Sequence, residues 1–86
     1  MQIVYIIQET WSEGGVVSSD LSSVYADNAK AEEVYRLLLL DEKETWQDEF
    51  GGEATIVEEE RTCYIASPEL PDTDWFRIEI HTRELR

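Results

Sequence analysis

The feature that most constrains the fold of this chain is a change in the spacing of its apolar residues near residue 28. Between residues 29 and 50 they recur every three to four positions, which is the period of an amphipathic helix. The members of this stripe are Ala31, Val34, Tyr35, Leu38, Leu39, Trp46 and Phe50. Asp27 or Asn28 can cap the start of the helix through a side-chain oxygen, and the two glycines at 51–52 supply a stop. The sequence therefore predicts one helix spanning much of residues 28–50.

The segments on either side of this helix have the alternation and β-branched composition of strands. Four strands are expected, near residues 2–9, 16–25, 54–65 and 74–84. The first is apolar on both faces at its centre, which is typical of an inner strand, and Gly14 and Gly15 predict a hairpin to the second. Pro68 and Pro71 predict a loop before the last strand, because proline removes a backbone donor and restricts the residue before it.

Together these elements predict a single α+β domain over residues 1–86. The expected architecture is a two-layer sandwich in which one long helix packs on a mainly antiparallel four-stranded sheet, in the order β-β-α-β-β. A continuous helix would be about 34 Å long, and a break near Asp41 is the alternative. The four leucines at 37–40 spread around the helix, so at least one of them lies outside the face packed on the sheet and marks a candidate contact surface.

The charge of the chain constrains its partners. Its 20 Asp and Glu residues against 7 Lys and Arg give a net charge of -13. This excess opposes binding to nucleic acid or to an anionic membrane and predicts a basic protein partner. The chain has no apolar run of about 20 residues and no signal-like N-terminus, and a single cysteine, Cys63, fits a reducing compartment, so we expect a cytoplasmic protein.

Residues that could carry catalysis or bind a metal are few. Cys63 and His81 alone could supply a thiolate or an imidazole, whereas a structural zinc site needs four ligands. They could act as nucleophile and base only if the third and fourth strands were adjacent and in register. The sequence has no phosphate-binding glycine loop and no calcium loop. We therefore expect a non-enzymatic protein with no metal and no cofactor, and keep a small hydrolase as a minor alternative.

The densest charge lies in residues 41–60, where nine acidic side chains accompany a single lysine, Lys43. On a helix, carboxylates at positions 41, 44 and 48 lie along one side. Three consecutive glutamates at 58–60 put charge on both faces of a strand, which indicates an edge or a protruding hairpin. An exposed tryptophan among these charges would strengthen a contact with a partner. The expected partner-binding residues are Asp41, Glu44, Asp48, Glu49, Glu58, Glu59, Glu60 and Trp46.

Several short segments of the N-terminal half form a recognisable pattern. A YIIQET opening strand, an EGG turn and a serine-rich strand running into YADNAKAEEVYRLL are similar to the small uncharacterised β-β-α-β-β proteins of phages and bacterial mobile elements. The similarity covers residues 3–40 best, and the acidic C-terminal half departs from the pattern. The resemblance implies a non-enzymatic accessory role, often in the contest between phage and host defence.

These observations lead to one expected function and one alternative. The expected function is inhibition of a nucleic-acid-binding host defence complex, of anti-CRISPR or anti-restriction type, by mimicry of nucleic acid through the acidic residues. The alternative is a generic protein-protein interaction module that dimerises through the leucines at 37–40. A third interpretation is that the acidic residues only form a solvated surface, as most charge runs do.

Overall fold

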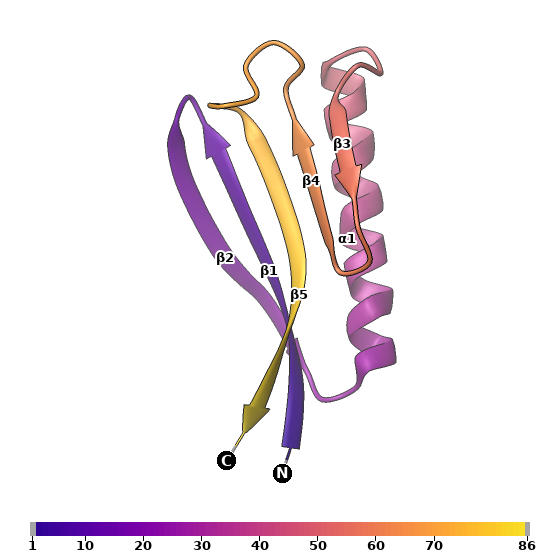
Figure 1. The fold of residues 1–86 in the computed structure, drawn as a ribbon. Helices are drawn as coiled ribbons and strands as arrows, with labels where there is room; N and C mark the ends of the chain where they lie inside the picture. Colours follow the sequence, from indigo (N-terminus) through magenta and orange to yellow (C-terminus); the bar gives the residue numbers. More distant parts are fainter. Residues whose placement is uncertain (1, 86) are drawn as a thin grey trace.

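The computed structural model describes residues 2–85, with the backbone alone at Ser22, and contains one helix and five strands (Figure 1). The elements in chain order are β1 (Gln2–Glu13), β2 (Val16–Tyr25), α1 (Asn28–Glu49), β3 (Thr55–Glu58), β4 (Thr62–Ala66) and β5 (Trp75–Leu85).

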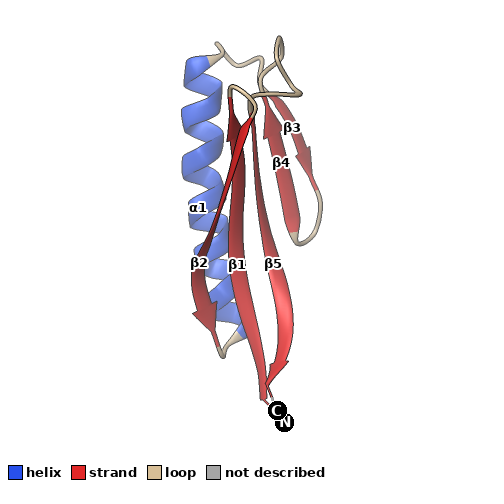
Figure 2. Ribbon diagram, turned by 90° about the vertical axis from the view of Figure 1, so that its left-hand side faces the viewer, coloured by secondary structure: helices blue, strands red, loops and turns tan. Residues whose placement is uncertain are grey.

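The strands form one antiparallel sheet in the order β2-β1-β5-β4-β3. The first and last strands lie at its centre and pair over most of their length, from Gln2 opposite Leu85 to Ser12 opposite Trp75. The start of β1 and the end of β5 are therefore side by side (Figures 1 and 2). The helix connects the edge strand β2 to the opposite edge strand β3 and covers one face of the sheet (Figure 2).

The prediction of a four-stranded sheet in the order β-β-α-β-β is wrong. The structure has five strands in the order β-β-α-β-β-β, because residues 54–65 form two strands and not one. The chain reverses at 59–61, where the Glu59 amide donates to the Thr62 carbonyl at 2.8 Å. Consecutive glutamates here would place like charges on both faces of a continuous strand, so a solvated turn is the cheaper conformation. The first strand is also longer than expected and continues to Glu13.

The helix prediction is confirmed. It runs without a break through Asp41, from Asn28 to Glu49, and Asp27 caps it by accepting from the Ala29 amide at 2.8 Å. It ends where Gly51 and Gly52 adopt positive φ angles of 62° and 84°. No helix in residues 2–85 is long and apolar enough to cross a membrane.

The core lies between α1 and the sheet. Its largest fully buried side chains are Ile7, Ile65, Ile78 and Cys63, and Tyr35 and Leu39 pack on them from the helix. Burying an aliphatic side chain of this size stabilises a fold by about 1.5–3 kcal/mol. On the opposite side of the helix, Leu37 and Leu40 are 63% and 57% exposed, which confirms that part of the leucine run faces away from the sheet.

Candidate functional site

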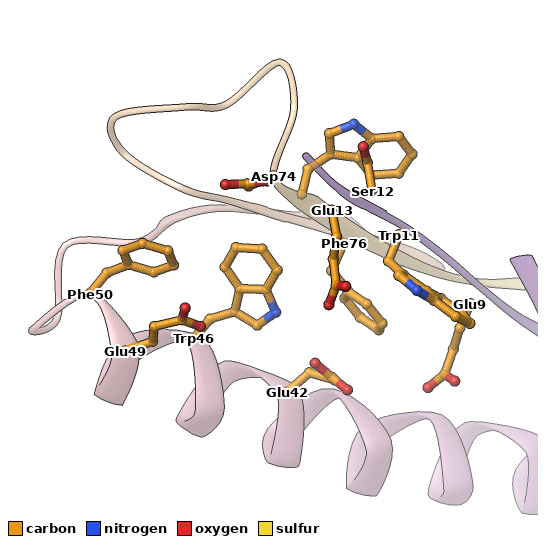
Figure 3. Close-up of a pocket in the computed structure, with 11 residues that line it drawn as sticks. Glu9, Trp11, Ser12, Glu13, Glu42, Trp46, Glu49, Phe50, Asp74 and Phe76 are labelled. Atoms are coloured by element: carbon orange, nitrogen blue, oxygen red, sulfur yellow. The ribbon is translucent and has the colours of Figure 1, made fainter. Parts of the chain in front are cut away.

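A cleft of about 490 Å³ lies between the C-terminal half of α1 and the adjoining ends of β1 and β5 (Figure 3). On the sheet side, Glu9 is opposite Ile78 and Trp11 is opposite Phe76 in the register of β1 and β5. Directly opposed residues point to the same face of a sheet. Glu9 and Trp11 therefore point toward the helix together with Ile78 and Phe76. Figure 3 shows Glu42, Trp46 and Phe50 rising from α1 toward them.

Aromatic side chains form the walls of this cleft. Four of them face it: Trp11, Trp46, Phe50 and Phe76. Trp75 borders the cleft, but its ring lies against Tyr64 and Arg77 on the face of the sheet that points away from α1. The Trp46 and Phe50 rings stack with their centroids 5.6 Å apart at an interplanar angle of 29°. Phe76 is buried and belongs to the core, whereas Trp11, Trp46 and Phe50 are half-buried and keep part of their surface open. Aromatic faces carry partial negative charge, so these walls favour a cation.

Carboxylates complete the lining. They are Glu9, Glu13, Glu42, Glu49 and Asp74. None of the eleven lining residues, all of which the structure describes, is a lysine, an arginine or a histidine. The cleft thus combines apolar aromatic surface with a negative charge that its own lining does not neutralise.

Glu42 is affected both by burial and by the charges near it. Burial, reinforced by the negative charges of Glu9 and Asp41, raises the pKa of the Glu42 carboxyl above its ordinary value, while a hydrogen bond from the Trp46 side chain partly opposes the rise. Burial and a like charge both disfavour the ionised form of a carboxyl. A cation in the cleft would offset the repulsion and favour the ionised form of Glu42.

The far end of the cleft is held by hydrogen bonds between the β1–β2 turn and the loop before β5. The Ser12 hydroxyl donates to the Thr73 carbonyl at 2.8 Å, and the Gly14 amide donates to Asp74 Oδ1 at 2.8 Å. The Gly15 amide adds a bond of 3.2 Å to the Thr73 carbonyl. These bonds fix one carboxylate of the rim and restrain the strand end that carries Trp11.

The residues expected to bind a partner are distributed over three places. Asp41, Glu44 and Asp48 are exposed on α1, together with Leu37 and Leu40. Within the described part of the chain, no ion pair includes any of these three carboxylates. We call them the outer stripe.

The other expected residues lie elsewhere. Glu49 and Trp46 line the cleft, so Trp46 is a half-buried wall and not a protruding contact. Glu58 ends β3 and pairs with Lys43 of α1 at 2.6 Å, while Glu59 and Glu60 are exposed in the β3–β4 turn. The structure therefore does not gather the eight residues into one patch.

Arg61 follows these glutamates and holds the turn against the start of α1. Its Nη2 atom lies 2.6 Å from Asn28 Oδ1 and 3.5 Å from Glu32 Oε1. Its guanidinium also lies 5.9 Å from the centre of the Tyr5 ring. The β3–β4 hairpin is thus attached to the helix at Lys43 and at Arg61, which places its two free glutamates beside the N-terminal half of α1.

The sequence interpretation missed Glu9, Glu13, Glu42 and Asp74 as site residues. A usable signal was present in β1, where Glu9, Trp11 and Glu13 occur at every second position and so share one face of a strand. Ending the first strand at residue 9 hid this pattern. Asp74 joins the site only through the pairing of β1 with β5, which the sequence alone does not indicate.

Cys63 and His81 do not form a pair. Their strands, β4 and β5, are adjacent, but Cys63 is opposite Ile78 on the helix-facing side, and His81 points to the other face. Burial raises the pKa of the Cys63 thiol, and Glu58 adds to the rise. His81 Nε2 lies 2.8 Å from Gln8 Oε1 and 3.6 Å from Glu79 Oε1. In residues 2–85, no group of three or more His, Cys, Asp and Glu side chains is placed to hold a metal ion.

No protein-family model matches the chain, and neither a curated protein nor a solved structure matches it. The resemblance of residues 3–40 to small phage proteins stays a prediction. The fold and the site define an acidic α+β domain with two candidate binding surfaces, the outer stripe of α1 and the aromatic cleft beneath it.

Proposed function

We propose that this protein is a non-enzymatic binding protein that attaches to a basic, nucleic-acid-binding protein or complex and competes with its nucleic acid. The observation that carries the proposal is the outer stripe: three exposed carboxylates of one helix, Asp41, Glu44 and Asp48, with no ion pair inside the described chain. A surface of this kind is matched by the lysine and arginine tracks with which proteins bind nucleic acid.

The charges of the outer stripe are spaced by a distance of the same order as the charges of nucleic acid. At a rise of about 1.5 Å per residue, its carboxylates follow one another at intervals of roughly 5 Å along the helix axis. A strand of duplex DNA carries a charge about every 3.4 Å. Because the backbone of a helix is already ordered, these charges lose little backbone entropy when they bind a partner. The net charge of -13 would also steer a basic partner toward the protein and raise the association rate.

Within this proposal the partner is a host defence complex in the cytoplasm, and the protein is its inhibitor, of anti-CRISPR or anti-restriction type. The support for this narrower statement is the likeness of residues 3–40 to small phage accessory proteins, together with the negative charge. The mechanism requires no catalytic group of this chain, because occupation of the nucleic-acid channel is sufficient for inhibition.

A second candidate function is a generic interaction or dimerisation module. The observation that favours it is the exposure of Leu37 and Leu40, 63% and 57%, on the same side of α1 as the outer stripe. An apolar contact at these leucines would not weaken with salt, whereas exposed charge pairs are screened over about 8 Å at physiological ionic strength. Salt dependence therefore separates the two functions.

The test is a matched pair of charge reversals, assayed against the partner captured from host cells. One variant replaces Asp41, Glu44 and Asp48 by lysine, and the other replaces Glu69, Asp72 and Glu84, which are exposed elsewhere. Both change the net charge by the same amount. The outer-stripe variant should slow association far more than the control. Equal effects of the two variants on the association rate would show that the outer stripe is only a solvated surface.

A further inference from the structure

We propose that the aromatic cleft takes one guanidinium group, supplied by an arginine side chain of the basic partner. This inference rests on the proposed function for its source of arginine, but it concerns a different surface from the outer stripe. The overall negative charge attracts any basic surface, whereas the cleft would select one arginine side chain by its shape.

The shape of the cleft suits such a guest. Its volume of about 490 Å³ lies within the range of roughly 300–1,000 Å³ that is typical of ligand sites. It opens between α1 and the sheet, with Trp46 and Phe50 on one wall and Trp11 on the other (Figure 3). The apolar stem of an arginine can pack along these rings while its charged end reaches the carboxylates.

The chemistry of the lining selects a cation. A cation over an aromatic face gains about 0.5–2 kcal/mol, and the gain is larger where water is excluded. The carboxylates of Glu13 and Glu49 lie at the exposed rim, whereas Glu9 and Glu42 lie deeper and are half-buried. The lining holds no lysine, arginine or histidine, so none of its own side chains can neutralise these carboxylates.

Arginine fits better than lysine for two reasons. Its planar guanidinium stacks on aromatic rings and binds a carboxylate through two parallel hydrogen bonds, and it is less strongly hydrated than an ammonium group. The chain holds one guanidinium near an indole elsewhere, since Arg77 lies 5.9 Å from the centre of the Trp75 ring on the face of the sheet that points away from α1. In the cleft, the Trp46 and Phe50 rings offer aromatic surface for the same kind of contact.

The direct test is a titration of the isotopically labelled protein with N-acetyl-arginine amide, followed through the three tryptophan indole signals in NMR spectra. N-acetyl-citrulline amide, which has nearly the same shape without the charge, is the matched ligand control. We expect saturable shifts at Trp11 and Trp46, and binding of the citrulline compound weaker by about tenfold or more. Equal affinities, or shifts that spare both indoles, would overturn the proposal.

Two further ligands identify the source of the cation. N-acetyl-lysine amide should bind more weakly than the arginine compound, because the ammonium group lacks the planar face. Spermidine represents a free small-molecule cation. If spermidine binds in the cleft more tightly than a short arginine-containing peptide does, the assignment to a protein side chain is wrong.

Matched variants separate the cleft from the outer stripe. Replacing Glu13 and Glu49 by glutamine removes two rim charges and should weaken binding of the arginine compound about fivefold or more. Replacing Glu44 by glutamine and Asp48 by asparagine removes the same charge from the outer stripe and should leave this binding unchanged. All four residues are exposed, so neither variant disturbs the core.

The results also distinguish failure of this inference from failure of the proposed function. If the arginine compound binds in the cleft but charge reversal in the outer stripe does not affect the captured partner, the proposed function fails and the cation site stands. If the outer-stripe reversal slows association while the rim variant binds the arginine compound as the wild type does, the cleft assignment fails alone.

Discussion

Glu9 on β1 and Glu42 on α1 face each other from the sheet and the helix, and the negative charge of Glu9 contributes to the raised pKa of Glu42 (Figure 3). Two carboxylates held in this way in a half-buried cleft repel each other and lose hydration. Binding sites commonly tolerate such a cost to stability when the charges are used to hold a ligand.

Replacing Glu42 by glutamine should therefore stabilise the protein. The folded state binds the Glu42 proton more tightly than the unfolded state does, so the stability that this group contributes falls as the pH rises from the ordinary glutamate pKa through the raised folded value. At pH 7 the variant should gain roughly 0.5 kcal/mol in the free energy of unfolding, with the gain disappearing in acid. Urea unfolding from pH 4 to 7 measures it, and the exposed Glu44→Gln variant is the control. A loss of stability at pH 7 would contradict the repulsion.

Tyr35 offers a second test of burial. Its hydroxyl is buried, and no group in the described chain forms a hydrogen bond with it. Replacing Tyr35 by phenylalanine should therefore increase the free energy of unfolding by about 1 kcal/mol, because a buried donor without a partner is removed. Thermal unfolding at neutral pH measures the change. A clear loss of stability would mean that the Tyr35 hydroxyl forms a hydrogen bond in the folded protein.

The same residue should control stability in alkali. Burial, with smaller contributions from Cys63, Glu58 and Glu79, raises the pKa of Tyr35 from 10.0 to about 12. The unfolded chain loses this proton near pH 10, whereas the folded protein keeps it, so the stability contributed by the neutral phenol is lost as the pH rises from 10 through 12. Unfolding of the wild type should show this loss, and Tyr35→Phe should reduce it.

The attachment of the β3–β4 hairpin can be tested at its two cations. Arg61→Ala should lower the free energy of unfolding by about 1–2 kcal/mol, because it removes a charged hydrogen bond to Asn28 and an ion pair with Glu32. Lys43→Ala should cost under about 1 kcal/mol, since its pair with Glu58 is half-exposed. The exposed Arg83→Ala variant is the control, with an expected change within about 0.5 kcal/mol. Equal costs at Arg61 and Arg83 would show that the hairpin does not depend on this contact.

The helix could be predicted from the sequence because its signals are local. The stripe that contains Tyr35 and Leu39, the Asp27 cap and the two glycines at 51–52 all act within a few residues of the chain. The turn at 59–61 was less predictable, because it depends on the cost of placing like charges on both faces of a continuous strand. The three glutamates at 58–60 do indicate an edge or a protruding hairpin, but residues on both sides of them favour strands, so the sequence predicts one strand where the structure has two.

The cleft could be predicted only in part. Trp46, Glu49 and Phe50 were recognised as aromatic and acidic residues of one helix, but their neighbours come from residues far along the chain. Glu9 and Trp11 reach them because β1 lies at the centre of the sheet beneath α1, and Asp74 because β5 pairs with β1. Strand order is set by tertiary packing, and alternation within a strand does not report it.

The central claim is that the acidic surface and nucleic acid occupy the same place on a basic partner. The most direct measurement is a competition experiment: the captured partner is immobilised with its nucleic acid, and release of the nucleic acid is followed as this protein is added at several salt concentrations. We predict complete displacement, no complex that contains both ligands, and affinity for the partner that falls steeply with salt. A stable complex containing the partner, its nucleic acid and this protein, with affinity independent of salt, would contradict the account.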